Sequence, residues 1–189
     1  NGVSSSINSN AIVNTINGLE TFNNNGVISN WLVPNGVYTI EIYINGSIGG
    51  NAGAITPGIY NVNLTGGSGG NFGYGYIKLN VMPNDIITYY IGNNGNNGNN
   101  ISTVNALVCG GTGYQGQTSY INKNNLSVIK IAGGFGGNGA CYNQGYVVSQ
   151  GTNGTNGYID ILGLEQSGFF PQKIENIYSS QKQTIIIRY

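Results

Sequence analysis

The sequence contains no histidine among its 189 residues. Histidine is the usual base that activates a serine or cysteine nucleophile, and it is a common ligand of catalytic zinc. The six acidic residues lie far apart along the chain, so no carboxylate pair or calcium loop has local support. We therefore expect a protein that is not an enzyme, with no catalytic residue, no metal site and no cofactor.

Charge is also scarce, because only 6% of the residues are charged and the formal net charge is zero. A neutral chain has no electrostatic attraction for nucleic acid or for anionic lipid. A surface without charge also responds little to pH or salt. These properties favour an extracellular protein, placed at a cell surface or a virion surface.

Long apolar runs and helix signals are missing as well. No stretch approaches the roughly 18 consecutive apolar residues of a membrane-spanning helix. No apolar secretory segment opens the chain, and its start at Asn1 favours a processed, mature form. No segment combines helical periodicity with capping residues.

Glycine and asparagine dominate what is present, and together they make up about a third of the chain. Apolar residues still reach 39%, enough to predict a folded domain rather than a disordered one. Ile40, Ile42 and Ile44 alternate with other residues, as in a half-buried strand. Similar patterns predict strands over 37–44, 59–64, 76–82, 86–91, 104–108, 126–131, 158–162 and 184–189.

Between these strands, glycine recurs at every third position. The period matches the three residues per turn of a polyproline-II helix, and a glycine on every turn would let bare backbones approach and pair. The alternative is that these stretches are flexible loops. The period-three glycines are Gly67, Gly70, Gly73, Gly92, Gly95, Gly98, Gly110, Gly113, Gly116, Gly133, Gly136, Gly139, Gly151, Gly154 and Gly157.

The order of these motifs supports a family resemblance over about two thirds of the chain. The motifs are W-x-V-P-N-G-V-Y-T-I-x-I (31–42), G-S-I-G-G-N-A-G-A (46–54), G-G-S-G-G-N-F-G (66–73), V-M-P-N-D (81–85), Y-Y-I-G-N-N-G (89–95) and A-G-G-F-G-G-N-G-A (132–140). Their order resembles the glycine-rich domains of some receptor tyrosine kinase ectodomains and of viral and bacterial fibre proteins. The resemblance implies an all-β fold, in which glycine-rich polyproline-II helices are inserted into a jelly-roll-like β-sandwich.

Three regions follow from this reading. Residues 31–162 form the glycine-rich head, residues 1–30 an N-terminal arm, and residues 163–189 a C-terminal tail with a final strand. An arm with spaced apolar residues could insert as a strand into a neighbouring subunit, or it could dock on its own domain. The assembly candidates are Ile12, Val13, Ile16 and Leu19, with Ile185, Ile186 and Ile187 as the alternative strand.

Two kinds of residue suggest covalent modification. Cys109 and Cys141 are an even pair, which favours a disulfide in an extracellular protein, although two buried thiols are the alternative. Five Asn-x-Ser/Thr sequons are candidate glycan acceptors. They begin at Asn45, Asn63, Asn100, Asn125 and Asn153.

The sequence thus predicts a structural subunit of an extracellular filament or fibre that assembles with copies of itself by strand insertion. By composition alone it also resembles donor-strand-linked filament subunits of archaea and bacteria. The alternative is an adhesin at a virion or phage tail-fibre tip, which would bind surface glycans or a host receptor through exposed loops at 93–100 and 138–143. Neither hypothesis involves nucleic acid or a membrane span.

Overall fold

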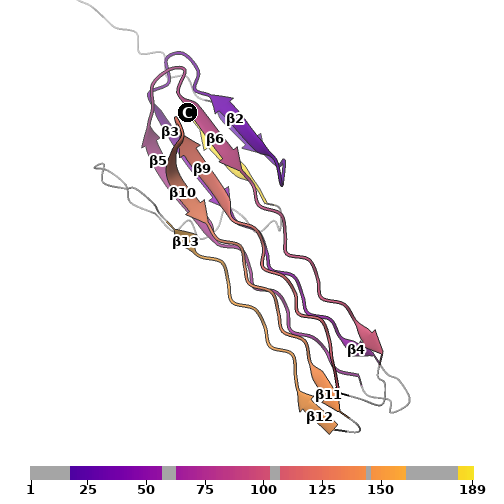
Figure 1. Ribbon diagram of the computed structural model, residues 1–189. Helices are drawn as coiled ribbons and strands as arrows, with labels where there is room; N and C mark the ends of the chain where they lie inside the picture. The colour runs from indigo at the N-terminus through magenta and orange to yellow at the C-terminus, as the bar shows by residue number, and fades with distance from the viewer. Residues whose placement is uncertain (1–17, 57–62, 103–106, 144–145, 161–182) are drawn as a thin grey trace, which may run out of the picture.

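A computed structural model describes residues 18–56, 63–102, 107–143, 146–160 and 183–189. These residues form strands, turns and extended segments, with no helix among them. Two parts are visible in Figure 1: a pair of larger sheets at one end, and a long column of extended segments that ends in short strands. The fold is therefore all-β, as the sequence predicts.

The first sheet has the order β1-β14-β3-β5, and every neighbouring pair is antiparallel. The second has the order β13-β10-β9-β6-β2 and is also antiparallel throughout. The strands of the first sheet are β1 (Leu19–Phe22), β14 (Ile185–Arg188), β3 (Thr39–Asn45) and β5 (Tyr74–Asn80). Those of the second are β13 (Ile159–Asp160), β10 (Leu126–Ile131), β9 (Ser119–Lys123), β6 (Ile86–Tyr90) and β2 (Ile28–Leu32).

The alternation of isoleucine along the strands explains why these two sheets pack face to face. Ile40 and Ile42 of the first sheet, and Ile87 and Ile121 of the second, are all 0% exposed and belong to one core. Burial of each such side chain contributes about 1.5–3 kcal/mol. The arrangement is sandwich-like, and we refer to this end of the molecule as the sandwich.

The far end of the column holds two small sheets, which we call the tip. One joins β12 (Tyr146–Ser149), β11 (Cys141–Asn143) and β8 (Val108–Cys109), and the other pairs β4 (Ile55–Thr56) with β7 (Ile101–Ser102). A second, smaller core lies here, formed by Ile55, Leu64, Ala140 and Tyr142.

Both ends of the described chain belong to the sandwich. β14 lies between β1 and β3, with Ile185 and Ile187 fully buried, so the final strand docks in its own sheet. This placement argues against Ile185, Ile186 and Ile187 as a strand donated to a neighbour. β1 and β2 also form part of the sandwich, although both begin inside the region predicted as an arm (1–30).

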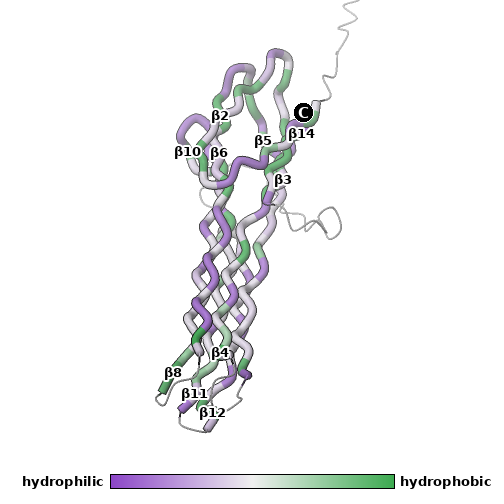
Figure 2. Tube along the Cα trace, turned by 90° about the vertical axis from the view of Figure 1, so that its right-hand side faces the viewer, coloured by the Kyte–Doolittle hydropathy of each residue, from purple (hydrophilic) through white to green (hydrophobic). Residues whose placement is uncertain are grey.

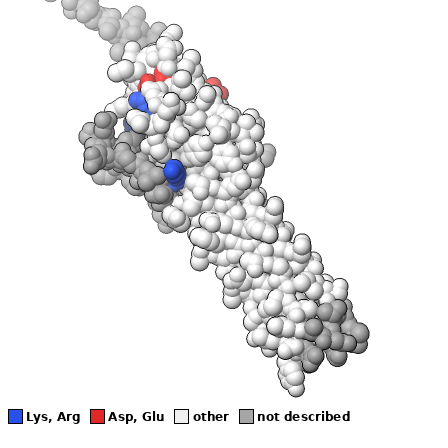
Figure 3. Space-filling view, viewed as in Figure 1, with Lys and Arg blue, Asp and Glu red and all other residues white. Residues whose placement is uncertain are grey.

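Every charged residue of the described chain lies in the strands and turns of the sandwich. Figure 3 shows blue and red atoms only at that end, and the column below it is white. One charged group is well anchored. The Asp85 carboxylate accepts hydrogen bonds from the Met82 N–H (2.8 Å) and Asn124 Nδ2 (2.7 Å), and it pairs with Lys123 Nζ at 3.0 Å.

These contacts make the turn sensitive to acid. Burial raises the pKa of Asp85, but the hydrogen bonds and the Lys123 charge outweigh it and hold this pKa below its ordinary 3.8. Stability that comes from a lowered carboxyl pKa is fully present above the pKa of the unfolded state. It is lost as the pH falls through the pKa of the folded state.

We predict that Asp85→Asn lowers the free energy of unfolding by about 1–2 kcal/mol at neutral pH, because charge-assisted hydrogen bonds are lost. Urea unfolding at several pH values measures this. The difference in unfolding free energy between wild type and variant should become smaller as the pH drops below about 4. A gap that stays constant down to acid pH would contradict the assigned role.

Candidate functional site: the glycine-rich stem and its tip

Six extended segments run between the sandwich and the tip, and together we call them the stem. The first, third and fifth segments lead away from the sandwich, and the second, fourth and sixth return to it (Figure 1). In chain order they are residues 46–54, 65–73, 92–100, 110–117, 132–140 and 151–158.

Main-chain hydrogen bonds join these segments at every third residue. Gly46, Gly49 and Ala52 of the first segment donate to carbonyl oxygens of the second at 2.8–2.9 Å. Gly50 and Gly53 of the same segment donate to the fourth segment, each at 2.8 Å. The period predicted from the glycine spacing is thus the period of the pairing.

The pairing partners define two rows of three segments. The first segment exchanges hydrogen bonds with the second, third, fourth and fifth, and the fifth does so with the first, second, fourth and sixth. The others have fewer partners. One row therefore has the order third-first-second and the other fourth-fifth-sixth, with the first and fifth segments in the middle of their rows.

Glycine is required because the segments lie too close for side chains. A Cβ added to Gly53 would lie 1.8 Å from the carbonyl oxygen of Asn99, and one added to Gly139 would lie 1.8 Å from that of Gly110. A Cβ at any of the fifteen period-three glycines would meet a main-chain atom of another segment at 3.1 Å or less. Substitution at these positions would force the segments apart.

Asparagine side chains complete the pairing on the outer side of each row. Oδ1 of an asparagine in the third segment accepts the N–H of a residue in the parallel first segment at 2.8–3.1 Å. The residue after that asparagine then donates its own N–H to the carbonyl of the same partner at 2.8–3.0 Å. The asparagines are Asn94, Asn97 and Asn100, and their partners are Ile48, Asn51 and Ala54.

We call this two-sided contact an asparagine clamp. It recurs between the sixth and second segments, where Asn153 and Asn156 hold Ser68 and Asn71. A clamp satisfies both main-chain groups of the residue it holds, which matters because unpaired main-chain groups are costly. Sequence reasoning missed this role, although the repeated Asn-Gly pairs 94–95, 97–98, 153–154 and 156–157 were a visible signal.

The clamps bear on the predicted sequons. Asn100 and Asn153 are clamp residues, and Asn45 is only 3% exposed, so the folded chain does not present Asn45 to a glycosylating enzyme. Asn63 and Asn125 are exposed. Asn100 and Asn153 are exposed as well, and their clamps engage Oδ1 rather than the Nδ2 that would carry a glycan, so four of the five candidate acceptors are accessible.

At the tip, Cys109 and Cys141 are joined in a disulfide. The two residues face each other across β8 and β11, and the bond encloses the fourth segment, the β9–β10 pair of the second sheet and the fifth segment within one loop of the chain. Of the predicted assembly residues, Leu19 lies in the edge strand β1 and is 61% exposed. Ile12, Val13 and Ile16 lie outside the described residues.

The tip also exposes apolar side chains. Tyr146, Val147 and Val148 of β12 are 78%, 50% and 58% exposed, and Leu107 beside β8 is 60% exposed. In Figure 2, which colours the chain by hydropathy, the stem is mostly pale or purple and β8 at its end is green. No charged residue lies in the described parts of the stem or tip.

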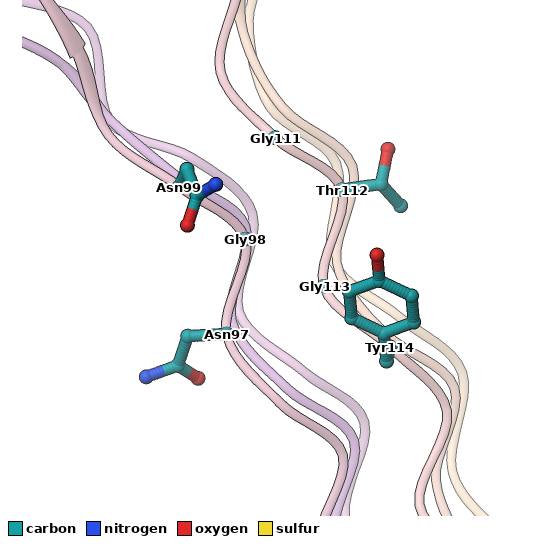
Figure 4. A pocket seen from close by; sticks show the side chains of 7 residues that line it. All are labelled: Asn97, Gly98, Asn99, Gly111, Thr112, Gly113 and Tyr114. Atoms are coloured by element: carbon teal, nitrogen blue, oxygen red, sulfur yellow. The ribbon is translucent and has the colours of Figure 1, made fainter.

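A shallow groove of about 300 Å³ follows the outside of the stem between the third and fourth segments. Figure 4 shows Gly98, Gly111 and Gly113 on the backbone trace, with Asn97 and Tyr114 on the facing segments. Its lining offers amides, a hydroxyl and an aromatic ring, and no charge. One side of the groove, Asn97 to Asn99, lies in the predicted loop region 93–100, the other side lies outside it, and no residue of 138–143 takes part. Its full lining is Asn97, Gly98, Asn99, Gly111, Thr112, Gly113 and Tyr114.

No group of three or more acidic or cysteine side chains that could hold a metal occurs within the described ranges. In the same ranges, no helix is long and apolar enough to cross a membrane. Comparison with protein-family models, with curated proteins and with solved structures finds no match to this chain.

We predict that Asn97→Ala lowers the free energy of unfolding by about 1 kcal/mol, because the Asn51 N–H loses its acceptor. Asn96→Ala is the matched control, since Asn96 is exposed on the same segment and its side chain holds no clamp partner. Thermal and urea unfolding measure both variants. Equal effects of the two substitutions would rule out the clamp.

Proposed function

We propose that this chain is a non-enzymatic extracellular fibre protein, an adhesin whose stem holds a receptor-binding tip away from its point of attachment. The observation that carries the proposal is the separation of the two ends. Gly18 and Tyr189 are hydrogen-bonded to each other at the sandwich, whereas the exposed apolar strand β12 lies at the far end of the stem (Figure 1). The described chain therefore begins and ends at the sandwich, opposite the tip.

In this proposal the six stem segments are polyproline-II helices inserted into a jelly-roll-like sandwich. The period-three hydrogen bonds and the bare glycine contacts support this conformation. A nine-residue segment of such a helix spans about 28 Å at roughly 3.1 Å per residue. Cross-linking of six helices by main-chain hydrogen bonds would make the stem stiff, which an adhesin needs to present its tip.

The receptor-binding surface would be the β12 face and edge. Tyr146 offers a large aromatic ring with a hydroxyl, and Val147 and Val148 add apolar area beside it. Tyrosine suits binding surfaces because its ring packs against apolar groups or sugars while the hydroxyl remains hydrogen-bonded. Exposed apolar groups grouped on one edge strand are typical of an interaction site. The partner would be a surface glycan or a host surface receptor.

We predict that the paired substitution Tyr146→Asn and Val148→Asn abolishes binding of the labelled protein to cell surfaces, with little change in thermal stability. A panel of intact bacterial and animal cells and immobilised glycans provides the test. Leu126→Asn is the matched control, because Leu126 is 75% exposed at the start of β10 in the sandwich. Undiminished binding by the tip variant would refute this surface.

One observation favours the second candidate, a filament subunit that joins its neighbours by strand insertion. β1 is an edge strand, so the described chain leaves one side of its main chain without a neighbouring strand. An open edge is a template for a strand from another copy, and the region before β1 contains Ile12, Val13 and Ile16. β14 would not be the inserted strand, because it already lies between β1 and β3.

The filament candidate predicts that the chain forms open, head-to-tail polymers and that deletion of residues 1–17 leaves a monomer of unchanged stability. Electron microscopy and light scattering over a wide range of concentration test this. A chain that stays monomeric at every concentration would leave only the adhesin.

A further inference from the structure

Asn-Gly pairs are chemically weak points in proteins. The glycine main-chain nitrogen attacks the side-chain carbonyl carbon of the asparagine, a cyclic succinimide forms, and ammonia leaves. Water then opens the ring to give aspartate or isoaspartate. Glycine favours the attack because it has no Cβ to hinder it. Each event adds a negative charge, which matters for a chain with zero net charge.

In the stem, the asparagine clamps engage both reacting groups of these pairs. The attacking nitrogen belongs to Gly95, Gly98, Gly154 or Gly157, and each donates its N–H to a carbonyl oxygen of the parallel segment at 2.8–2.9 Å. The side-chain carbonyl under attack is held at the same time, because its Oδ1 accepts the N–H of the same partner residue. Ring closure therefore requires the segment to detach.

The turn between β2 and β3 is different. Asn35 and Gly36 are both exposed there, and Gly36 has φ of 84°. Within the described chain, no hydrogen bond engages the Gly36 N–H or the Asn35 side chain. The pair 138–139 is intermediate. Asn138 Nδ2 donates to Thr152 Oγ1 at 2.8 Å, but the Gly139 N–H donates to no carbonyl oxygen of the described chain.

We propose that the asparagine clamps protect the stem from deamidation and that Asn35-Gly36 is the most reactive Asn-Gly pair among the described residues. The pairs 25–26 and 45–46 are less open to attack, because the N–H groups of Gly26 and Gly46 each donate to a carbonyl oxygen at 2.8 Å. The stem surface carries no charge only as long as its amides persist, and the clamps preserve them without any repair. Conversion of Asn35 would place the new charge in the sandwich, where the charged residues of the described chain already lie.

The test is to incubate the folded, oxidised chain in warm, mildly alkaline buffer and to follow each Asn-Gly pair by peptide mass mapping. The unfolded, reduced chain is the reference for unprotected rates. We expect Asn35 to react in the folded chain at close to its unfolded rate. The four clamp asparagines that precede glycine should react at least about a hundredfold more slowly than when unfolded, because deamidation there requires local opening.

Two variants test the reactive site and the clamps separately. Asn35→Gln should remove the acidic species that peptide mapping assigns to residues 35–36, because the longer side chain closes its ring far more slowly. Gly53→Ala should separate the first segment from the third, because the new Cβ would overlap the Asn99 carbonyl. It should also separate the first segment from the fourth, because the Gly53 N–H donates to the Gly111 carbonyl oxygen. That variant should raise deamidation at Asn97 without affecting Asn156.

Two outcomes would overturn the proposal. Clamp asparagines that react in the folded wild-type chain as fast as in the unfolded chain would disprove protection. An Asn35 that reacts no faster than the clamp asparagines would disprove the site. Neither outcome depends on what the tip binds, so the result stands apart from the proposed function.

Discussion

The structure depends on direct hydrogen bonding between main chains that have no side chains between them. A β-sheet pairs each strand with two neighbours at most, but the first and fifth stem segments each pair with four. That number is possible only where glycine allows the backbones to approach, as at Gly53, where a Cβ would overlap the Asn99 carbonyl. The stem therefore needs almost no apolar core, and its cohesion comes from polar groups that water would otherwise occupy.

This way of packing explains the unusual composition. Because most side chains of the stem point outward, the stem needs residues that stay hydrated without charge. Asparagine does so while its Oδ1 also accepts the remaining N–H groups of a parallel neighbour. The inner parallel pair, the first and fifth segments, has glycine where the outer pairs have asparagine, since no space is left for a clamp. The apolar residues are concentrated instead in the sandwich and in the small core of the tip.

The sequence predicted the all-β fold, most of the long strands and the period of the glycine segments, because strand alternation and glycine spacing are local signals. It did not predict β9 (Ser119–Lys123), because this strand is mostly polar and contributes one residue, Ile121, to the apolar core. It also missed β1 and β2, which lie in an Asn- and Ser-rich region. Nor could it place β14 between β1 and β3, because pairing between residues far apart in sequence leaves no local trace. The clamps were missed because asparagine was interpreted through sequons and surface polarity.

Native-state hydrogen exchange of the stem amides tests the central claim most directly. Glycine-rich stretches that form a hydrogen-bonded stem should protect the N–H groups of Gly50, Gly53, Gly95 and Gly98 to a degree comparable with the core strand β3. In the third segment, the N–H groups of Asn96, Asn97 and Asn99 have no hydrogen-bond partner within the described chain and should exchange rapidly, so that protection there follows a period of three. In the first segment, where every residue from Ile48 to Ala54 donates its N–H, protection should be continuous. Uniformly fast exchange along these stretches would show that they are unpaired loops and would contradict the account.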